Sequence, residues 1–378
     1  MEILNVASYT ALFLTLLYAL VVISFIRGWF RLVPFMYNNT LPQIAVSVIV
    51  AARNEGENIS STIEDLLAQD YDHSLLELIF IDDHSTDNTG KIISSYADRG
   101  VKLITLNEKQ ALNSYKKKAI QTAIGEAKGK LIITTDADCS MGVNWLKTIV
   151  AYYQEGDYKM ISSPVAYTGE LNLFERGQSL EFLYLICLGA STIGNQQPST
   201  CNGANLAYER DAFYEVGGFT GIDDLASGDD ELLLHKMAEK YPGKIGFLKN
   251  RDAIVYTGAK PTLRDFIQQR KRWASKSIRY KNKSIIVLGV LIWLFNVSIV
   301  LNLIAGIFIP ALLEIAGLQL LLKFIIELVF LVGVTRFARR TELLWLLPVL
   351  TVVHIIYIIF IAIAGNSGKY NWKGRMVN

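Results

Sequence analysis

The chain has 378 residues, of which 51% are hydrophobic, and its mean hydropathy is positive at +0.29. Lysine and arginine (37) nearly balance aspartate and glutamate (35), so the net charge of +2 gives no reason to expect nucleic acid as a partner. Three cysteines and four scattered histidines fit neither a disulfide framework nor a zinc site, and they predict reduced thiols in a cytosolic compartment. The hydrophobic excess instead indicates membrane spans.

Apolar stretches long enough to cross a bilayer occur at residues 9–26, 285–308, roughly 318–334, and 343–364. Arg27 and Arg31 follow the first stretch, which has neither the leading positive charge nor the small-residue cleavage site of a signal peptide. We therefore expect an uncleaved anchor, with the segment after it in the cytosol. Basic residues at 270–283 and 336–340 predict that the second and third stretches form a hairpin with both outer ends on that same side.

The last stretch leaves two topologies open. If 343–364 crosses the bilayer, the basic tail at 369–375 lies outside against the positive-inside rule; otherwise the stretch bends at Pro348 and returns. Lys323 and Glu327 lie four residues apart inside the third stretch, where ionisable groups are costly. They can pair with each other, Lys323 can reach the interface, or the two can line a polar path for an acceptor.

Residues 42–262 alternate strand-like and helix-like patterns, which predicts an α/β domain with a largely parallel sheet. We expect strands at 45–52, 75–81, 101–106 and from 131 onward, and helices at 58–69, from about 88 to 97, and at 118–127. The apolar run 182–193 is either a core helix or a helix lying along a bilayer surface.

Acidic side chains follow two of these strands, at Asp82 with Asp83 and at Asp136 with Asp138. In open α/β sheets ligands bind beyond the carboxyl ends of the strands. Two carboxylates in a D-x-D spacing can hold one hard divalent cation, Mg²⁺ or Mn²⁺, and leave positions for phosphate oxygens. A solvated turn is the alternative for a lone D-x-D. The basic cluster at 115–118 either faces a diphosphate across this site or forms a solvated helix start.

Several motifs occur in a fixed order along the chain: VSVIVAARNE (46–55), DDHSTDNT (82–89), TTDADC (134–139), CNGANLAYERDAFYEVGGF (201–219), SGDDELL (227–233) and QRKRW (269–273). Together they resemble the family 2 glycosyltransferases with a GT-A fold. The similarity is to the membrane-anchored branch that contains the cellulose, hyaluronan and poly-N-acetylglucosamine synthase-type catalytic subunits. Ala51 stands where many members have proline, and the acid pair reads Asp229-Asp230 where Glu-Asp is commoner.

The resemblance implies a role for individual side chains. The second acid of the pair corresponds to the general base, Asp230, although an acidic helix N-terminus is the alternative for this pair. Arg272 would bind the diphosphate and Asp138 the metal. Nucleotide-sugar contacts are implied for Ala51, Asn54, Glu55, Asp83, Lys116 and Asp136, and acceptor contacts for Asn202, Gly203, Asn205, Gln269 and Trp273. Trp273 also suits a membrane-interface anchor.

We therefore expect a membrane-bound inverting glycosyltransferase that uses a nucleotide diphosphosugar, a UDP-sugar by resemblance, and a divalent metal. The acceptor would be a lipid, a lipid-linked glycan or a growing polysaccharide. The Q-x-x-R-W motif favours a processive polysaccharide synthase, whereas the small number of spans favours a single addition to a lipid. A non-catalytic membrane scaffold is a further alternative. The expected location is a bacterial inner membrane, with the catalytic domain in the cytoplasm.

The expected organisation has five parts along the chain. These are an N-terminal anchor (1–35), a GT-A domain (42–262), an interfacial segment with the Q-x-x-R-W motif (263–284), membrane helices (285–364) and a basic tail (365–378).

Overall fold

The computed structural model describes residues 2–37, 43–108, 114–365, 370–372 and 375–377. The chain divides into two compact units. The helical unit contains Met1–Trp29, Leu171–Tyr184 and Lys260–Gly368, and the sheet unit contains Phe30–Glu170, Leu185–Ala259 and Lys369–Asn378. Of the predicted basic tail, residues 366–369, 373–374 and 378 lie outside the described residues.

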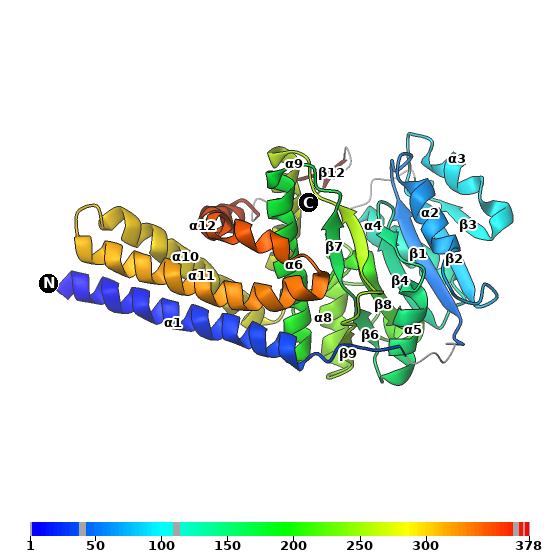
Figure 1. The fold of residues 1–378 in the computed structure, drawn as a ribbon. Helices are drawn as coiled ribbons and strands as arrows, with labels where there is room; N and C mark the ends of the chain where they lie inside the picture. Colours follow the sequence, from blue (N-terminus) through cyan, green and yellow to red (C-terminus); the bar gives the residue numbers. More distant parts are fainter. Residues whose placement is uncertain (1, 38–42, 109–113, 366–369, 373–374, 378) are drawn as a thin grey trace. The chain divides into compact units, whose positions relative to one another are not determined.

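The sheet unit is built on a seven-stranded sheet in the order β3-β2-β1-β4-β8-β6-β9 (Figure 1). Its first four strands are parallel, as the sequence predicted, and β8 runs antiparallel to both β4 and β6. The strand bounds are β1 (Val46–Ala52), β2 (Leu76–Asp82), β3 (Val101–Thr105), β4 (Leu131–Asp136), β6 (Met160–Ser162), β8 (Leu206–Glu209) and β9 (Ile245–Phe247).

Central strands of this sheet are apolar because both of their faces are covered. Four of the helices that accompany them are α2 (Ile59–Leu67), α3 (Thr89–Ser94), α4 (Tyr115–Glu126) and α5 (Trp145–Glu155). Two further helices are α7 (Arg210–Glu215) and α8 (Glu231–Lys240), with 3-10 turns at η1 (Ala97–Arg99) and η2 (Gly203–Asn205). A second sheet contains β5 (Ser140–Met141), β10 (Val255–Gly258) and β7 (Val165–Thr168), and the tail forms the hairpin of β11 (Tyr370–Trp372) and β12 (Arg375–Val377).

The strand register brings the two acidic strand ends to one edge. In β1, Ala51 pairs with Asp136 of β4, and the next residue, Ala52, pairs with Asp82 of β2. Side chains that follow these strands therefore lie at the same carboxyl edge, where a parallel sheet binds its ligands.

The helical unit contains α1 (Glu2–Arg31), α9 (Leu263–Ser275), α10 (Lys283–Ala305), α11 (Pro310–Ala338) and α12 (Leu347–Ala364), with 3-10 turns at η3 (Lys276–Arg279) and η4 (Thr341–Leu346). Helix α6 (Leu173–Gly194) begins in this unit and ends in the sheet unit. Among the described residues, four helices are long and apolar enough to cross a membrane: Leu4–Arg31, Lys283–Ala305, Pro310–Ala338 and Thr341–Ala364. This agrees with one predicted N-terminal span and three C-terminal spans.

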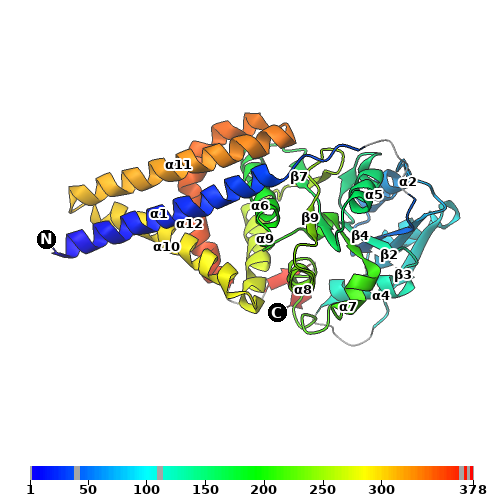
Figure 2. The ribbon, with the colours of Figure 1, turned by 90° about the horizontal axis from the view of Figure 1, so that it is seen from below.

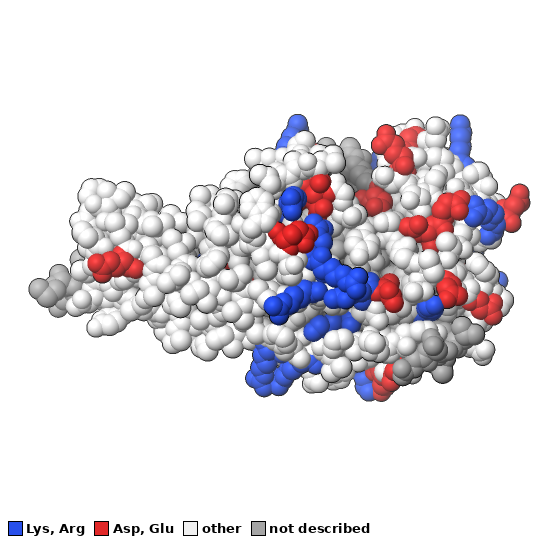
Figure 3. Space-filling model, in the orientation of Figure 1, with Lys and Arg blue, Asp and Glu red and all other residues white. Residues whose placement is uncertain are grey.

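The long helices pack side by side and carry little charge. Helix α1 lies alongside α11 in both ribbon views (Figures 1 and 2), and Trp29 packs edge-on against Phe337 with ring centroids 5.4 Å apart. On the face drawn in Figure 3, charged side chains are sparse over α1, α10 and α11 and mixed in sign over the sheet unit. Pro348 lies in the first turn of α12, where its missing N–H interrupts no helical hydrogen bond. The described residues of α12 therefore continue as one helix to Ala364.

Lys323 and Glu327 form the predicted i,i+4 pair inside the helical unit, with 2.5 Å between Nζ and Oε1. The side chains are 1% and 7% exposed, so the lysine does not reach toward an interface. The Tyr18 hydroxyl from α1 also donates to Glu327 Oε1, at 2.5 Å. We call these three residues the Lys323 cluster; it joins α1 to α11 through polar contacts.

Candidate active site

Asp136 and Asp138 lie where β4 ends, at the carboxyl edge of the large sheet. The strand before them is buried, whereas the Asp136 side chain is 38% exposed and Asp138 is exposed. The next residue, Cys139, is buried, and burial followed by the nearby carboxylates of Asp136 and Asp138 raises its pKa well above the usual value. The thiol is therefore protonated at neutral pH, which leaves only the two carboxylates of this stretch as ionised groups for a cation.

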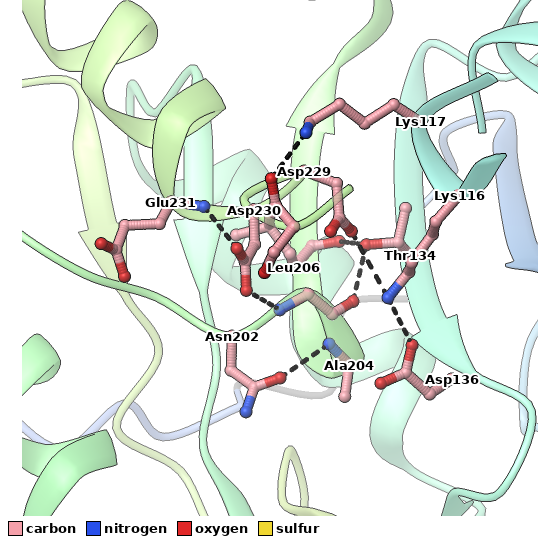
Figure 4. Close-up of polar contacts among 12 residues, drawn as sticks. Lys116, Lys117, Thr134, Asp136, Asn202, Ala204, Leu206, Asp229, Asp230 and Glu231 are labelled. Carbon is pink, nitrogen blue, oxygen red and sulfur yellow. Dashed lines mark hydrogen bonds and ion pairs between the residues drawn. The ribbon is translucent and has the colours of Figure 1, made fainter. Parts of the chain in front are cut away.

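Lys116 from α4 lies between two acids that are far apart in the sequence (Figure 4). Its Nζ is 2.8 Å from Asp136 Oδ1 and 3.4 Å from Asp229 Oδ2. Burial alone would lower the pKa of Lys116, but the negative charges of Asp136 and Asp229 outweigh burial and raise it. Lys116 is therefore a permanent cation at the sheet edge, and we call Lys116, Asp136 and Asp229 the Lys116 cluster.

The neighbouring Asp230 has a different environment from Asp229. It caps α8: its Oδ1 accepts from the Glu231 N–H at 2.7 Å, and its Oδ2 accepts from the Gly203 N–H at 3.1 Å. A Cβ at Gly203 would lie 3.3 Å from Asp229 Oδ2 and 3.4 Å from the Asp230 Cβ, so a side chain there would crowd both acids. The predicted acceptor loop and the acid pair are thus in direct contact.

The acceptor loop is held by its own hydrogen bonds. Asn202 Oδ1 accepts from the Ala204 N–H at 2.9 Å, and the Thr134 hydroxyl donates to the Gly203 carbonyl at 2.9 Å. Asn205 is fully buried, donates to the carbonyls of residues 164 and 253, and accepts from the Trp145 indole N–H at 3.0 Å. The Asn205 amide is therefore used within the fold, whereas Asn202 borders the acid pair.

The predicted nucleotide loop contacts the loop after β2. Asn54 Oδ1 accepts from the Thr86 N–H at 2.8 Å, and the Glu55 N–H donates to the Thr89 hydroxyl at 2.8 Å. The Asp83 side chain is 2% exposed and lies at this end of β2, and Ala51 pairs with Asp136 in the sheet. These residues line the same carboxyl edge as the Lys116 cluster.

The predicted site residues of the Q-x-x-R-W motif belong to the helical unit. Gln269 and Trp273 flank the buried Arg270, which the sequence did not single out. The Arg270 guanidinium pairs with Glu181 at 2.5 Å and lies 4.3 Å from the Trp273 ring centroid. Arg272, on the same helix, is partly exposed. Arg270 thus fixes α9 against α6 within this unit.

Lys117, next to the predicted Lys116, was also not singled out from the sequence. Lys117 is 1% exposed, and its Nζ donates to the carbonyls of Leu225 and Ser227 at 2.6 Å each. It therefore holds the loop that leads into Asp229. The signal was present in the sequence, because Lys117 shares the buried face of α4 with Ile120 and Ile124 at helical spacing.

Known proteins resemble this chain both in sequence and in fold. The model of the family "Glycosyl transferase family 2" matches residues 47–217. The mannosyltransferase PcManGT from Pyrobaculum calidifontis superposes with a TM-score of 0.59 at 18% identity, over 96% of this chain and 97% of its own. The large sheet with its acidic carboxyl edge is therefore a GT-A-type fold, as predicted. Residues 47–217 of the chain thus match the family 2 glycosyltransferases in sequence.

Two curated relatives are more similar in sequence. The chain is 26% identical over 240 residues to the Beta-monoglucosyldiacylglycerol synthase of Synechocystis sp., covering 62% of this chain and 48% of the relative. It is 25% identical over 255 residues to the Probable glycosyltransferase YdaM of Bacillus subtilis, covering 65% of this chain and 58% of the relative. The chain thus spans about half the length of these relatives.

Proposed function

We propose that the protein transfers a sugar from a nucleotide diphosphosugar to a lipid or lipid-linked acceptor. The observation that carries this proposal is the Lys116 cluster, in which one cation contacts the D-x-D acid Asp136 and the acid-pair residue Asp229. A site for sugar transfer needs positive charge for a diphosphate next to a carboxylate that can take a proton. The cluster supplies both groups at one sheet edge.

A divalent cation, Mg²⁺ or Mn²⁺, fits the donor side. The described residues contain no group of three or more His, Cys, Asp or Glu side chains that could hold a metal by themselves. Such a set is not required here, because Mg²⁺ is commonly held by one or two carboxylates together with substrate phosphates. Asp138, exposed at the end of β4, and Asp136 would supply these carboxylates. When bound, the cation would neutralise charge that develops on the leaving diphosphate.

The contacts support Asp229 over its neighbour as the general base. The sequence assigned this role to Asp230, whose two oxygens each accept a backbone N–H and cap α8. Asp229 instead faces Lys116. In our proposal the Asp229 carboxylate takes the proton of the acceptor hydroxyl while that oxygen bonds to the sugar C1. The bond from C1 to the diphosphate breaks on the opposite side, and the configuration at C1 is inverted.

Two positively charged side chains would stabilise the diphosphate. Lys116 can exchange its contact with Asp136 for a phosphate oxygen, since the lysine and Asp136 side chains are 24% and 38% exposed. Arg272 is proposed as a second phosphate partner because a planar guanidinium matches phosphate oxygens. Gln269 and Trp273, on the same helix, are proposed for the acceptor, together with Asn202 and Gly203.

A membrane lipid is the acceptor that the helices favour. Four long apolar helices give the chain the composition of a membrane protein. The relative from Synechocystis sp. is named for a diacylglycerol lipid, and PcManGT is described in complex with GDP-Man and Mn2+.

We propose a bacterial inner-membrane protein with a cytoplasmic sheet unit. In intact cells, a Ser94→Cys variant lacking the native cysteines should react with an impermeant maleimide only after lysis; strong labelling before lysis would exclude this topology.

A processive polysaccharide synthase is the second candidate, and the QRKRW sequence of α9 is the observation in its favour. The same assay separates the two candidates. Purified protein is incubated with Mn²⁺, a membrane lipid extract and a panel of radiolabelled nucleotide sugars. The lipid proposal predicts one label in a chloroform-soluble product of fixed size. A ladder of water-soluble polymer would support the synthase, and no transfer from any donor would refute both.

A further inference from the structure

The loop after β2 holds His84 in an unusual backbone conformation. His84 has φ of 54°, a left-handed value that is uncommon for residues other than glycine and costs free energy. Arg53 Nη1 holds this turn by donating to the Asp83 carbonyl at 2.9 Å and to the His84 carbonyl at 2.7 Å. Such strain persists where surrounding contacts fix it, and it often accompanies a functional role.

The imidazole of His84 lies against the carboxylate of Asp83, a residue for which a nucleotide-sugar contact is implied. Its Nδ1 is 2.9 Å from Asp83 Oδ1, a hydrogen-bond distance at which the ring nitrogen donates and the carboxylate oxygen accepts. On the other side of the ring, Nε2 is 3.3 Å from the Glu108 carbonyl. The ring also packs edge-on against Tyr115, with centroids 5.9 Å apart. Because of these contacts, rotating the imidazole away from Asp83 would cost free energy.

Nucleobases differ in how many donors they offer to a carboxylate. Guanine presents two adjacent N–H donors, at N1 and N2, which match both oxygens of one carboxylate in a bidentate contact. Uracil presents a single donor at N3 between two carbonyl oxygens. A bidentate contact therefore uses both Asp83 oxygens, and Oδ1 already lies 2.9 Å from His84 Nδ1.

We propose that His84 is a specificity-determining residue that makes the nucleobase site select uracil over guanine. It acts through Asp83, as a positioning residue that competes with the base for Oδ1 of the carboxylate. The inference rests on the proposed function and assigns the nucleotide-sugar contact implied for Asp83 to the base. Guanine would have to share Oδ1 with the imidazole or displace it, and either event weakens the bidentate contact.

Nucleotide binding tests this inference without requiring the acceptor. The full-length protein in detergent micelles is titrated calorimetrically with UDP and with GDP, both in the presence of Mn²⁺. The wild-type protein should bind UDP about tenfold or more tightly than GDP. In His84→Gly, whose glycine adopts the left-handed backbone freely, the ratio should fall toward one, mainly through tighter binding of GDP.

A second variant and a matched control separate selectivity from folding. His84→Asn also tolerates the left-handed backbone and removes the imidazole, so it should show the same loss of selectivity. His73→Asn changes an exposed histidine of the sheet unit and should keep the wild-type ratio. Equal affinities in the wild type, or a ratio unchanged in both His84 variants, would overturn the role of His84. Binding of neither nucleotide would overturn the proposed function itself.

Discussion

Each unit of the molecule contains a lysine paired with a carboxylate, and the two clusters differ in exposure and in charge balance. In the Lys116 cluster the lysine is 24% exposed, and two acids, Asp136 and Asp229, contact it. In the Lys323 cluster the lysine is 1% exposed and pairs with one acid, Glu327, which also accepts from Tyr18.

We expect this difference to distinguish a functional site from a structural contact. A sealed, balanced pair has no reason to change partners, because breaking it leaves an uncompensated charge in an apolar environment. A partly exposed cation with more than one acid can give up one partner for a phosphate at lower cost. Substitutions in the first cluster should therefore change activity, and substitutions in the second should change stability.

The largest effect is expected at the acid pair. Asp229→Asn should lower the transfer rate by about 100- to 10,000-fold, because the acceptor hydroxyl loses its general base, while nucleotide-sugar affinity changes only a few-fold. Asp230→Asn is the matched control, since asparagine is itself a good N-cap and preserves the start of α8. Single-turnover transfer measures both. If Asp230→Asn abolished transfer and Asp229→Asn did not, the base would be Asp230, as the sequence first indicated.

A smaller effect is expected for the cation of the same cluster. Lys116→Met should weaken nucleotide-sugar binding by about tenfold to a hundredfold, because a charge-assisted hydrogen bond to phosphate is lost. Lys118→Met removes an exposed lysine from the same helix and should leave the dissociation constant unchanged. Calorimetric titration gives both constants. Equal affinities for the two variants would mean that Lys116 only holds the fold together.

Substitutions in the Lys323 cluster should change the stability of the protein and leave its activity unchanged. Lys323→Met leaves Glu327 buried without its cation, so the free energy of unfolding should fall by about 1 to 5 kcal/mol. The rate of transfer per folded molecule should stay near that of the wild type. Thermal unfolding in micelles measures the first quantity, with Glu314→Gln, an exposed acid of the same helix, as control. A stable Lys323→Met protein with reduced transfer would instead support a polar path for the acceptor.

Much of the sheet unit follows from the sequence because its strands obey simple patterns. The runs that became β1, β2 and β4 are largely buried and rich in apolar residues, and acids at the ends of β2 and β4 marked the carboxyl edge. Strands β6 and β8, of three and four residues, were missed because so short a run carries no period. Helix α1 extends from Glu2 to Arg31, beyond the predicted 9–26, because polar residues at its ends do not break a helix.

The choice between adjacent charged residues depended on tertiary contacts. Lys116, Lys117 and Lys118 are consecutive lysines. Helical spacing indicates that Lys117 is buried, but only the packing of α4 shows that Lys116 lies at the sheet edge and Lys118 in solvent. Likewise, the start of α8 decides which acid of the Asp229-Asp230 pair becomes the cap. Arg270 could not be distinguished from Arg272 until its partner Glu181, far away in the sequence, was known.

In the proposed mechanism Asp136 and Asp138 form the donor site at the carboxyl edge of the sheet. The most direct test measures sugar transfer after dialysis against a chelator and again after Mn²⁺ or Mg²⁺ is returned, in the wild type and in Asp138→Asn. We expect transfer to be lost on chelation and to recover with metal in the wild type, whereas Asp138→Asn should stay inactive. Full turnover by the chelated wild-type enzyme would contradict this mechanism.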